Sequence, residues 1–404
     1  MKHPKKLKIL FVAMSDSIHT ARWLNQIADQ GWELHLFPCF DKGLSHPDLA
    51  NITVHHSVYS RRDNPNSKVT YRGLKVPKPI FARGGRWILD QFVEDYRAKQ
   101  LIRLIKKLQP DIIHSMEFSL AGYLTMRVKK ILHDKKFPQW IATNWGSDIY
   151  LFGRLKSHQQ KIREILANCD YYSCECQRDV CLAQNLGLKG KVLPVFPNAG
   201  GFDLKQIKKY RARGKTSSRK IITLKGYQNW AGRALVGLRA LERCADLIRE
   251  KGYELKIFGA DYSPDVVLSA ELFAQKTGIK TTVIANTTHQ NILKLHGSSR
   301  ISISSSISDA ISTSLLEAMV TGSFPIQSST ACAGEWIKDG QTGILVPPDD
   351  PDIIEKAIRR GLTDDNLVDE AAKINWRTIQ ERLDKKIIKQ KIIDFYREVE
   401  GRTR

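Results

Sequence analysis

Two carboxylates, Asp309 and Glu317, lie in a stretch of the sequence whose residue types suit sugar and phosphate chemistry. A Ser-rich loop follows the predicted strand Ile301–Ser304, and a helix is predicted to begin after it. The hydroxyl residues at its start make good N-caps: Ser312, Thr313 and Ser314. A helix N-terminus offers unpaired N–H groups and the positive end of a dipole, which suit a diphosphate. The two carboxylates could hold hydroxyls on sugars at either side of that diphosphate.

A diphosphate leaving group also needs positive charge nearby, because negative charge builds up on it as its bond breaks. The predicted strand Ile221–Leu224 is followed by Lys225 and Gly226, and a helix is predicted to begin near Arg233. We expect Arg233 to supply the positive charge, with Lys225 as the second candidate. A solvated surface charge is the alternative for each.

Polar residues also lie at the carboxyl ends of predicted strands in the first half of the chain. Asp16 and His19 follow the first strand, His114 lies in the last part of the third, and Asp148 follows the fourth. Ligands of open α/β sheets bind beyond the carboxyl ends of the strands, so all four residues are candidates for a role in a site. A lone histidine is more often structural, and this alternative stays open for His19 and His114.

Short apolar runs alternate with amphipathic helical stretches along the whole chain, which indicates βαβ units and parallel sheets. The predicted strands are Lys8–Ala13, Glu33–Phe37, Asp111–Ser115, Gln139–Thr143, Tyr171–Cys174, Val192–Phe196, Ile221–Leu224, Leu255–Phe258, Thr281–Ala285, Ile301–Ser304 and Phe324–Gln327. The predicted helices are His19–Gln30, Trp87–Leu108, Leu120–Leu132, Gln177–Gly187, Ala234–Lys251, Asp265–Gly278, Ile292–Gly297, Thr313–Thr321 and Ile387–Val399. The pattern predicts an α/β protein with two Rossmann-like, doubly wound domains that face each other across a cleft.

The 404 residues are too many for one ordinary core and suit two domains. We expect an N-terminal domain over residues 1–204, a basic linker over 205–219 and a C-terminal domain over 220–385. The last segment, 386–404, is predicted to be a helix that could pack back on the N-terminal domain. Residues 57–86 are basic and rich in Pro and Gly, and we expect a long connection there, either a solvated loop or a contact with an acceptor or a membrane surface.

The chain carries 64 Lys and Arg against 42 Asp and Glu, a net charge of +22, so its field attracts acidic partners such as phosphorylated ligands, an anionic membrane or nucleic acid. It contains no apolar run long enough to cross a bilayer and no secretory h-region, so we expect a cytoplasmic protein with reduced thiols. Four of the seven cysteines are spaced C-x4-C-x-C-x4-C: Cys169, Cys174, Cys176 and Cys181. This spacing suits small buried hydrophobes better than a zinc site, which remains the alternative.

The stretch Ser308–Asp352 resembles the family-4 glycosyltransferases of the GT-B fold. These enzymes typically show E-x7-E, A-M-A-x-G-x-P, a small-residue turn with Glu, and D-G-x-x-G-x-L-V. The matching residues, in one register, are Asp309, Glu317-Ala318-Met319, Gly322, Pro325, Gly334-Glu335, Asp339-Gly340, Gly343 and Leu345-Val346-Pro347. Looser matches are Gly226 in the family's G-R-L-x-x-x-K-G motif, Pro110–His114 and Asn198–Asp203.

The resemblance implies a retaining glycosyltransferase that moves a sugar from a nucleotide diphosphate-sugar to an acceptor. It implies that Glu317 holds the ribose hydroxyls, that Asp309 lies by the donor sugar, and that Glu335 belongs to the donor site. The second domain would hold the donor and the first the acceptor, with no metal and no other cofactor. We expect a glycan or lipid-linked saccharide as acceptor, in surface polysaccharide or glycolipid synthesis, with peripheral contact to the cytoplasmic face of an anionic membrane.

The sequence departs from the family pattern at three positions. Asp309 replaces a Glu, Tyr227 replaces an Arg, and Trp145 replaces a His. These departures leave open a catalytically silent relative that binds nucleotide-sugar or serves as a scaffold. A nucleic-acid-binding protein, which would use the basic charge but assign no role to the two carboxylates, is a further alternative.

Overall fold

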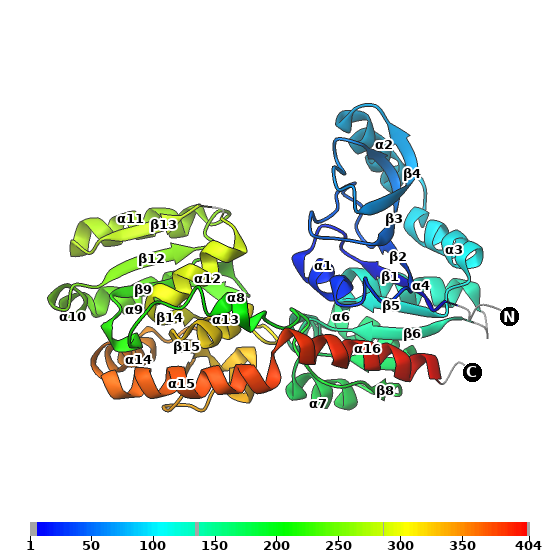
Figure 1. Ribbon diagram of the computed structural model, residues 1–404. Coiled ribbons are helices and arrows are strands. Elements are labelled where there is room, and N and C mark those ends of the chain that lie inside the picture. Colours follow the sequence, from blue (N-terminus) through cyan, green and yellow to red (C-terminus); the bar gives the residue numbers. More distant parts are fainter. Residues whose placement is uncertain (1–5, 134–136, 286, 402–404) are drawn as a thin grey trace. The chain divides into compact units, whose positions relative to one another are not determined.

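The computed structural model describes residues 6–133, 137–285 and 287–401. The chain divides into two compact units, one formed by Met1–Gly200 with Ile388–Arg404 and the other by Gly201–Ile387. We call them the first domain and the second domain. Each is built on one large parallel sheet with helices packed against it (Figure 1).

The first domain has an eight-stranded parallel sheet in the order β4-β3-β2-β1-β5-β6-β7-β8. Its strands are β1 (Lys8–Ala13), β2 (Glu33–Pro38), β3 (Ile52–Ser60), β4 (Val69–Val76), β5 (Ile112–Met116), β6 (Gln139–Thr143), β7 (Tyr171–Ser173) and β8 (Lys191–Val192). Its helices and helical turns are α1 (Ile18–Asn25), α2 (Pro79–Phe92), α3 (Tyr96–Leu108), η1 (Phe118–Gly122), α4 (Tyr123–Leu132), α5 (Ser147–Tyr150), η2 (Phe152–Arg154), α6 (Lys156–Asn168), α7 (Gln177–Asn185) and most of α16 (Lys385–Gly401). The strand order reverses between β1 and β5, and such a reversal is where ligands of open α/β sheets bind.

The C-terminal helix α16 completes the core of the first domain. Tyr396 on α16 is buried, and its hydroxyl accepts a hydrogen bond from Trp23 Nε1 at 2.7 Å. Phe395 packs edge-on against Trp23, with the ring centroids 5.6 Å apart. Because helices cover both faces of the sheet, the sequences of its buried strands are almost entirely apolar. The sequence of β1 is an example.

The second domain has a six-stranded parallel sheet in the order β13-β12-β9-β14-β15-β16, and a small antiparallel hairpin. Its strands are β9 (Ile221–Lys225), β10 (Gln228–Asn229), β11 (Gly232–Arg233), β12 (Glu254–Phe258), β13 (Thr281–Ile284), β14 (Ser299–Ser304), β15 (Phe324–Ser328) and β16 (Ile344–Val346). Its helices and helical turns are α8 (Leu204–Ile207), η3 (Thr216–Ser218), α9 (Ala234–Arg243), α10 (Ala245–Glu250), α11 (Pro264–Thr277), α12 (His289–Ser298), α13 (Thr313–Thr321), η4 (Ser329–Ala331), η5 (Ala333–Glu335), α14 (Pro351–Thr363) and α15 (Asp365–Arg382). The strand order reverses between β9 and β14.

The predicted fold class of two Rossmann-like α/β domains is confirmed, but the long connection predicted over residues 57–86 is wrong. This segment contains the end of β3, all of β4 and the first part of α2. β4 is the edge strand and carries mostly exposed residues, so it lacks the apolar pattern of a buried strand. Gly73 in β4 has a φ of +126°, and a Cβ there would lie 2.0 Å from the carbonyl oxygen of His56.

The segment expected to be a basic linker, residues 205–219, packs within the second domain. Arg211 Nη1 donates to the carbonyl of Val320 at 3.0 Å, and Thr216 Oγ1 donates to the carbonyl of Gly322 at 2.7 Å. Arg219 is buried, and its Nη1 donates to the carbonyl of Ser299 at 3.1 Å. The positive charges therefore lie near the C-terminal end of α13, where the helix dipole favours cations.

The cysteines form no disulfide with one another in the part of the chain that the structure describes. Cys169 and Cys174 belong to the hydrophobic core of the first domain. Burial raises the pKa of both thiols, to about 12 for Cys169. The prediction of small buried hydrophobes therefore fits Cys169, Cys174 and Cys176, which are buried, but it is wrong for Cys181, which is exposed.

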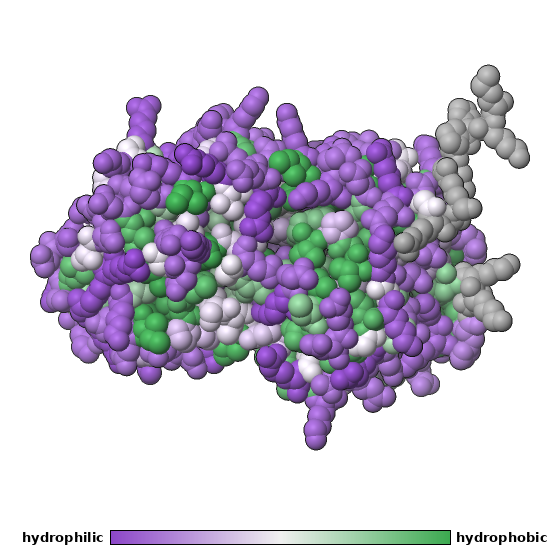
Figure 2. Space-filling view, turned by 90° about the horizontal axis from the view of Figure 1, so that it is seen from below, coloured by the Kyte–Doolittle hydropathy of each residue, from purple (hydrophilic) through white to green (hydrophobic). Residues whose placement is uncertain are grey.

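Among the described residues, no helix combines the length and apolar character needed to cross a bilayer. Hydrophilic side chains cover most of the face seen in Figure 2, and apolar residues show between them on both domains. A different surface, on α2, is strongly apolar. Its exposed side chains include Ile80, Phe81, Trp87, Ile88 and Phe92.

Candidate functional site

The candidate site lies in the second domain, at the carboxyl ends of the adjacent strands β9 and β14. The order of the sheet reverses between these two strands. β9 ends at Lys225 and β14 ends at Ser304, and a loop of residues 305–312 then leads to α13. The apolar side chains of both strands are packed in the domain core. This packing fixes the positions of the polar residues that follow the strands.

Backbone hydrogen bonds hold the loop 305–312 against the β10–β11 hairpin. The N–H of Arg233 donates to the carbonyl of Ser305 at 2.9 Å. The N–H groups of Ile307 and Ser308 both donate to the carbonyl of Trp230, at 2.9 and 3.0 Å. The hairpin therefore fixes the path of the loop into α13.

Two serine hydroxyls at this edge are candidates for ligand binding. Ser312 is the N-cap of α13, with extended backbone at φ −61° and ψ 120°, but its side chain makes no capping hydrogen bond. The Oγ atoms of Ser304 and Ser312 are buried and have no hydrogen-bond partner within the described part of the chain. Because buried hydroxyls are normally hydrogen-bonded, these two suit a polar ligand at the start of the helix. Thr313 and Ser314 form the first turn of α13.

Glu317 is buried on α13 and faces two histidines of α12. His289 Nε2 lies 2.6 Å from Glu317 Oε1, and His296 Nε2 lies 3.8 Å from Oε2. Burial lowers the pKa of His296 to about 4, although the charge of Glu317 opposes this effect. His296 Nδ1 also lies 2.9 Å from Ser302 Oγ. The carboxylate is thus held in one orientation, with His289 as its half-exposed hydrogen-bond donor.

Lys225 is a buried cation that shares the site with both predicted carboxylates. Burial lowers the pKa of Lys225, and the charges of Asp309 and Glu317 oppose this change. The Lys225 ammonium lies 4.6 Å from the centre of the Tyr227 ring, a favourable cation–π distance. Tyr227, which stands where the family pattern has Arg, therefore holds a neighbouring lysine in the site.

Gly226 and Arg233 complete this edge. The N–H of Gly226 donates to the carbonyl of Phe258 at 2.7 Å, and a Cβ at this position would lie 2.8 Å from the Cβ of Ala260. Only glycine therefore fits between the two strands. Arg233 is half-buried, and its Nε has no hydrogen-bond partner among the residues described.

The predicted donor residues do not all lie on the same two strands. Glu335 lies on η5, which follows β15, the strand next to β14, and it is half-buried. Its carbonyl accepts a hydrogen bond from Arg382 Nη1 at 2.8 Å. Lys225 and Gly226 lie at the end of β9, and Arg233 lies on β11. Asp309 is in the loop after β14, and the remaining predicted residues lie at the N-cap or in the first two turns of α13.

In the first domain, the structure does not support a catalytic role for His114. The side chain is fully buried, with Nδ1 2.7 Å from Tyr396 Oη and Nε2 2.6 Å from Thr143 Oγ1. Burial lowers the pKa of His114 to about 3. Because both ring nitrogens are engaged inside the core, the imidazole has no nitrogen left to exchange a proton with a substrate.

Asp148 forms a buried carboxyl pair with Glu117. Burial and the charge of Glu117 raise the pKa of Asp148 to about 7. Ser119 links the two side chains, because its Oγ lies 2.6 Å from Glu117 Oε2 and 3.4 Å from Asp148 Oδ1. Glu117 also accepts from the N–H groups of Leu120 and Ala121, whereas the Asp148 side chain accepts from the N–H of Trp145 at 2.7 Å. Burial raises the pKa of Glu117 as well. Because Glu117 accepts hydrogen bonds from Ser119, Leu120 and Ala121, its carboxylate is the better stabilised of the two, and the proton belongs on Asp148.

His19 and Trp145 meet at the carboxyl edge of the first sheet. Their ring centroids lie 5.6 Å apart with the rings tilted by 57°. Trp145, which stands where the family pattern has His, therefore packs against another histidine. Asp16 is paired with Lys42, whose Nζ lies 2.9 Å from Asp16 Oδ2.

The sequence reasoning missed His289, His296 and Glu117. The two histidines are two helical turns apart and therefore lie on one face of α12, which is a signal the sequence carries. Glu117 gave no such signal. Its φ of 78° and ψ of 154° lie in a region that residues other than glycine rarely adopt, and only the tertiary structure reveals this strain.

Two family descriptions match the sequence, one in each domain. "Glycosyl transferase 4-like" matches residues 8–76 and 92–172. "Glycosyl transferases group 1" matches residues 236–377. No curated protein matches the sequence significantly.

Several solved structures are similar to nearly the whole chain. Sucrose-phosphate synthase from Thermosynechococcus elongatus is 15% identical with a TM-score of 0.70, and the match covers 98% of this chain and 100% of that one. Alpha,alpha-trehalose 6-phosphate synthase from Burkholderia multivorans is 11% identical with a TM-score of 0.69, covering 99% and 100%. HepE from Anabaena in complex with UDP-glucose is 14% identical with a TM-score of 0.64, covering 97% and 100%.

At these identities the structural likeness shows the fold alone, whereas the two sequence matches identify the family of each domain. The chain belongs to the glycosyltransferases of the GT-B fold, with a 4-like first domain and a group 1 second domain.

Proposed function

We propose that the protein is a retaining glycosyltransferase that transfers a sugar from a nucleotide diphosphate-sugar, bound by the second domain, to a glycan or lipid-linked saccharide. The observation that carries this proposal is the convergence of Lys225, Asp309 and Glu317 at the start of α13. The UDP-glucose complex of the similar Anabaena protein supports a nucleotide-sugar as donor.

Each residue of this edge has a role that fits its surroundings. Glu317, oriented by His289, would accept hydrogen bonds from the ribose hydroxyls of the donor. The serine hydroxyls and the N–H groups of the first turn of α13 would bind the diphosphate. Asp309, in the loop ahead of the helix, would contact the donor sugar.

In the transfer step, the acceptor oxygen forms a bond to the anomeric carbon as the bond to the diphosphate oxygen breaks. Attack on the face from which the diphosphate departs gives retention, and the proton of the acceptor hydroxyl passes to the leaving phosphate. Negative charge grows on that phosphate, and Lys225 and Arg233 would neutralise it. A buried, pre-positioned cation is effective because water does not screen it.

We further propose that the enzyme works at an anionic membrane surface, through α2. Exposed fractions are 60% for Trp87, 70% for Ile80 and 74% for Phe92, which is unusual for large apolar side chains on one helix. The exposed cations Lys78 and Arg83 lie beside them in the sequence. Aromatic and aliphatic side chains flanked by cations suit insertion at an interface rich in anionic lipids.

The catalytic proposal is tested by nucleotide release from UDP-, GDP- and ADP-sugars, with and without membrane extract. We expect release with one donor, stimulated by the extract, and a fall of about 10- to 100-fold in kcat/KM for Glu317→Gln. The matched control is Glu271→Gln, which changes an exposed glutamate of α11 and should leave the rate unchanged. If no donor gives nucleotide release while nucleotide still binds tightly, the protein is a catalytically silent relative.

The membrane proposal is tested by flotation with phosphatidylglycerol vesicles. We expect the Phe81→Ser/Trp87→Ser variant to lose most of its vesicle binding. The matched control is Leu268→Ser/Leu272→Ser, which removes two exposed apolar side chains from α11 in the second domain. Equal loss in the two variants would rule out a specific role for α2.

A further inference from the structure

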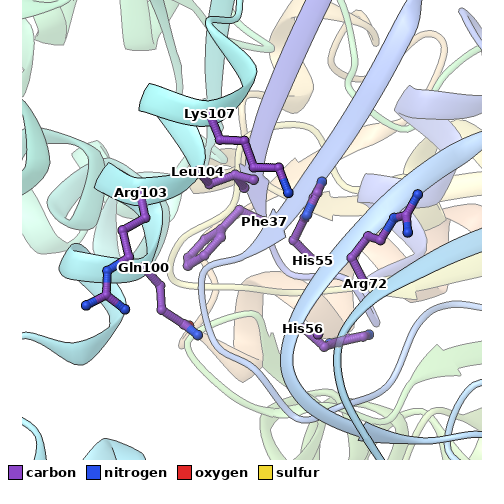
Figure 3. Close-up of a pocket in the computed structure, with 9 residues that line it drawn as sticks. Phe37, His55, His56, Arg72, Gln100, Arg103, Leu104 and Lys107 are labelled. Atoms are coloured by element: carbon purple, nitrogen blue, oxygen red, sulfur yellow. The ribbon is translucent and has the colours of Figure 1, made fainter.

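The first domain contains a basic pocket between α3 and the outer strands of its sheet. It has a volume of about 250 Å³ and is lined by residues from β2, β3, β4 and α3. Figure 3 shows Leu104 and Lys107 of α3 on one side, His55 and Arg72 of the strands on the other, and Phe37 between them. None of these residues belongs to the donor-binding edge described above.

Three cations from two elements line this pocket. Arg103 and Lys107 come from α3 one helical turn apart, and Arg72 comes from β4. In the described part of the chain, no carboxylate lines the pocket, and these three side chains take part in no ion pair. An opening bordered by cations without counter-ions attracts anions.

Two carboxylates of this domain, Glu33 and Asp41, contact histidines in or next to the pocket wall. Glu33 Oε1 lies 2.9 Å from His35 Nε2, and Glu33 also pairs with Lys8 at 3.6 Å. Asp41 Oδ1 lies 2.7 Å from His56 Nδ1, and its other oxygen accepts from Ser57. The ion pairs of these two carboxylates are with Lys8, Arg97 and histidines, and in the described part of the chain neither pairs with Arg72, Arg103 or Lys107, whose charges can act on a ligand.

His55 is a half-buried histidine of the pocket wall, and the pocket cations favour its neutral form. Burial lowers the pKa of His55 to about 4, and the charges of His35, Arg72 and Lys107 act in the same direction. His35 Nδ1 lies 3.0 Å from His55 Nε2. A bound anion would offset the positive charges of Arg72 and Lys107 beside this imidazole.

The chemistry of the lining and the size of the pocket define the ligand. Arginine, lysine and histidine together are typical donors to phosphoryl oxygens, which arginine can bind through two parallel hydrogen bonds. Phe37 and Leu104 supply an apolar wall beside these donors. The pocket is smaller than the roughly 300–1,000 Å³ common for drug-sized ligands, so it suits one phosphoryl group with a short apolar attachment.

We propose that this pocket binds a phosphoryl group attached to a small apolar moiety. The ligand is either a soluble phosphate ester or the headgroup of a phospholipid, since both present the same chemistry. The site belongs to the first domain and does not depend on donor binding or on sugar transfer.

The test is calorimetric titration of the full chain with phenyl phosphate and with inorganic phosphate at low ionic strength. We expect saturable binding, tighter for phenyl phosphate because its ring can contact Phe37. The single variants Lys107→Met and Arg103→Met should each weaken it about 5-fold or more. The matched controls Lys106→Met and Lys99→Met remove exposed cations of α3 that do not line the pocket, and they should change the affinity less than about 2-fold.

Flotation with vesicles of phosphatidic acid distinguishes the two sources of the phosphoryl group. Vesicle binding that falls in Lys107→Met and Arg103→Met, but not in the controls, would identify a lipid headgroup. Phenyl phosphate binding that depends on these cations, with vesicle binding that does not, would identify a soluble ester. Absence of saturable binding to all three probes, or equal losses in pocket and control variants, would overturn the proposal. Thermal melting followed by circular dichroism checks that the variants fold, which the exposure of both side chains predicts.

Discussion

Replacement of Asp148 by Asn should make the first domain more stable at neutral pH, although Asp148 is buried and hydrogen-bonded. The folded-state pKa of Asp148 is raised from its ordinary 3.8 to about 7, by burial first and then by the charge of Glu117. Between these two pKa values the folded state binds more protons than the unfolded state, so stability falls as the pH rises from about 4 to 7. Above pH 7 the penalty of the buried charge is fully present.

The difference between the two pKa values corresponds to about 4 kcal/mol, which is an upper limit because the domain relaxes around the charge. Asn keeps the geometry of a protonated aspartate. Its amide oxygen can accept from the N–H of Trp145, and its amide nitrogen can donate to Ser119 Oγ. We therefore expect Asp148→Asn to equal the wild type near pH 4 and to exceed it by about 1–4 kcal/mol at pH 8.

The assay is urea unfolding at pH values from 4 to 8, read by pulsed hydrogen exchange of β5 and β6, which reports the first domain separately from the second. Glu94→Gln, which removes an exposed carboxyl of the same domain, serves as the control and should follow the wild type at every pH. A difference between Asp148→Asn and wild type that stays constant with pH would refute the reasoning, because it would mean that Asp148 does not take up a proton on folding.

Three further substitutions test individual contacts. Gly226→Ala would bring a Cβ to 2.8 Å from that of Ala260, so we expect a loss of about 1–3 kcal/mol in urea unfolding of the second domain. His289→Ala removes the donor to Glu317, and we expect nucleotide affinity, measured by calorimetry, to fall about 10-fold while the domain stays folded. Tyr396→Phe leaves both Trp23 Nε1 and the His114 nitrogen without a partner in the core, which should destabilise the first domain by about 1–3 kcal/mol in urea. Wild-type behaviour of any of these variants would show that the corresponding contact contributes little.

Most of the two sheets could be predicted from the sequence, because strands of a buried parallel sheet must be apolar on both faces. β1 and β6 begin and end where the apolar runs do. The sequence did not predict β4, because an edge strand needs no continuous apolar run. Its exposed residues have the composition of a loop. The segment 205–219 was expected to be a linker, but it packs within the second domain. Its cations bind backbone carbonyls at helix ends, and a sequence pattern does not reveal such contacts.

The sequence by itself determined the two-domain α/β architecture and the motif that brings Asp309 and Glu317 to the start of one helix, because both follow from local patterns of residue type and spacing. Only the tertiary structure decided which polar residues could act. The sequence pointed to His114 and not to His289, yet His114 is enclosed by Tyr396 and Thr143 while His289 orients Glu317. The partners of His114 are far away along the chain, and burial and hydrogen bonding depend on such contacts rather than on neighbouring residues. For the same physical reason, only the fold could assemble the basic pocket of the first domain from β2, β3, β4 and α3.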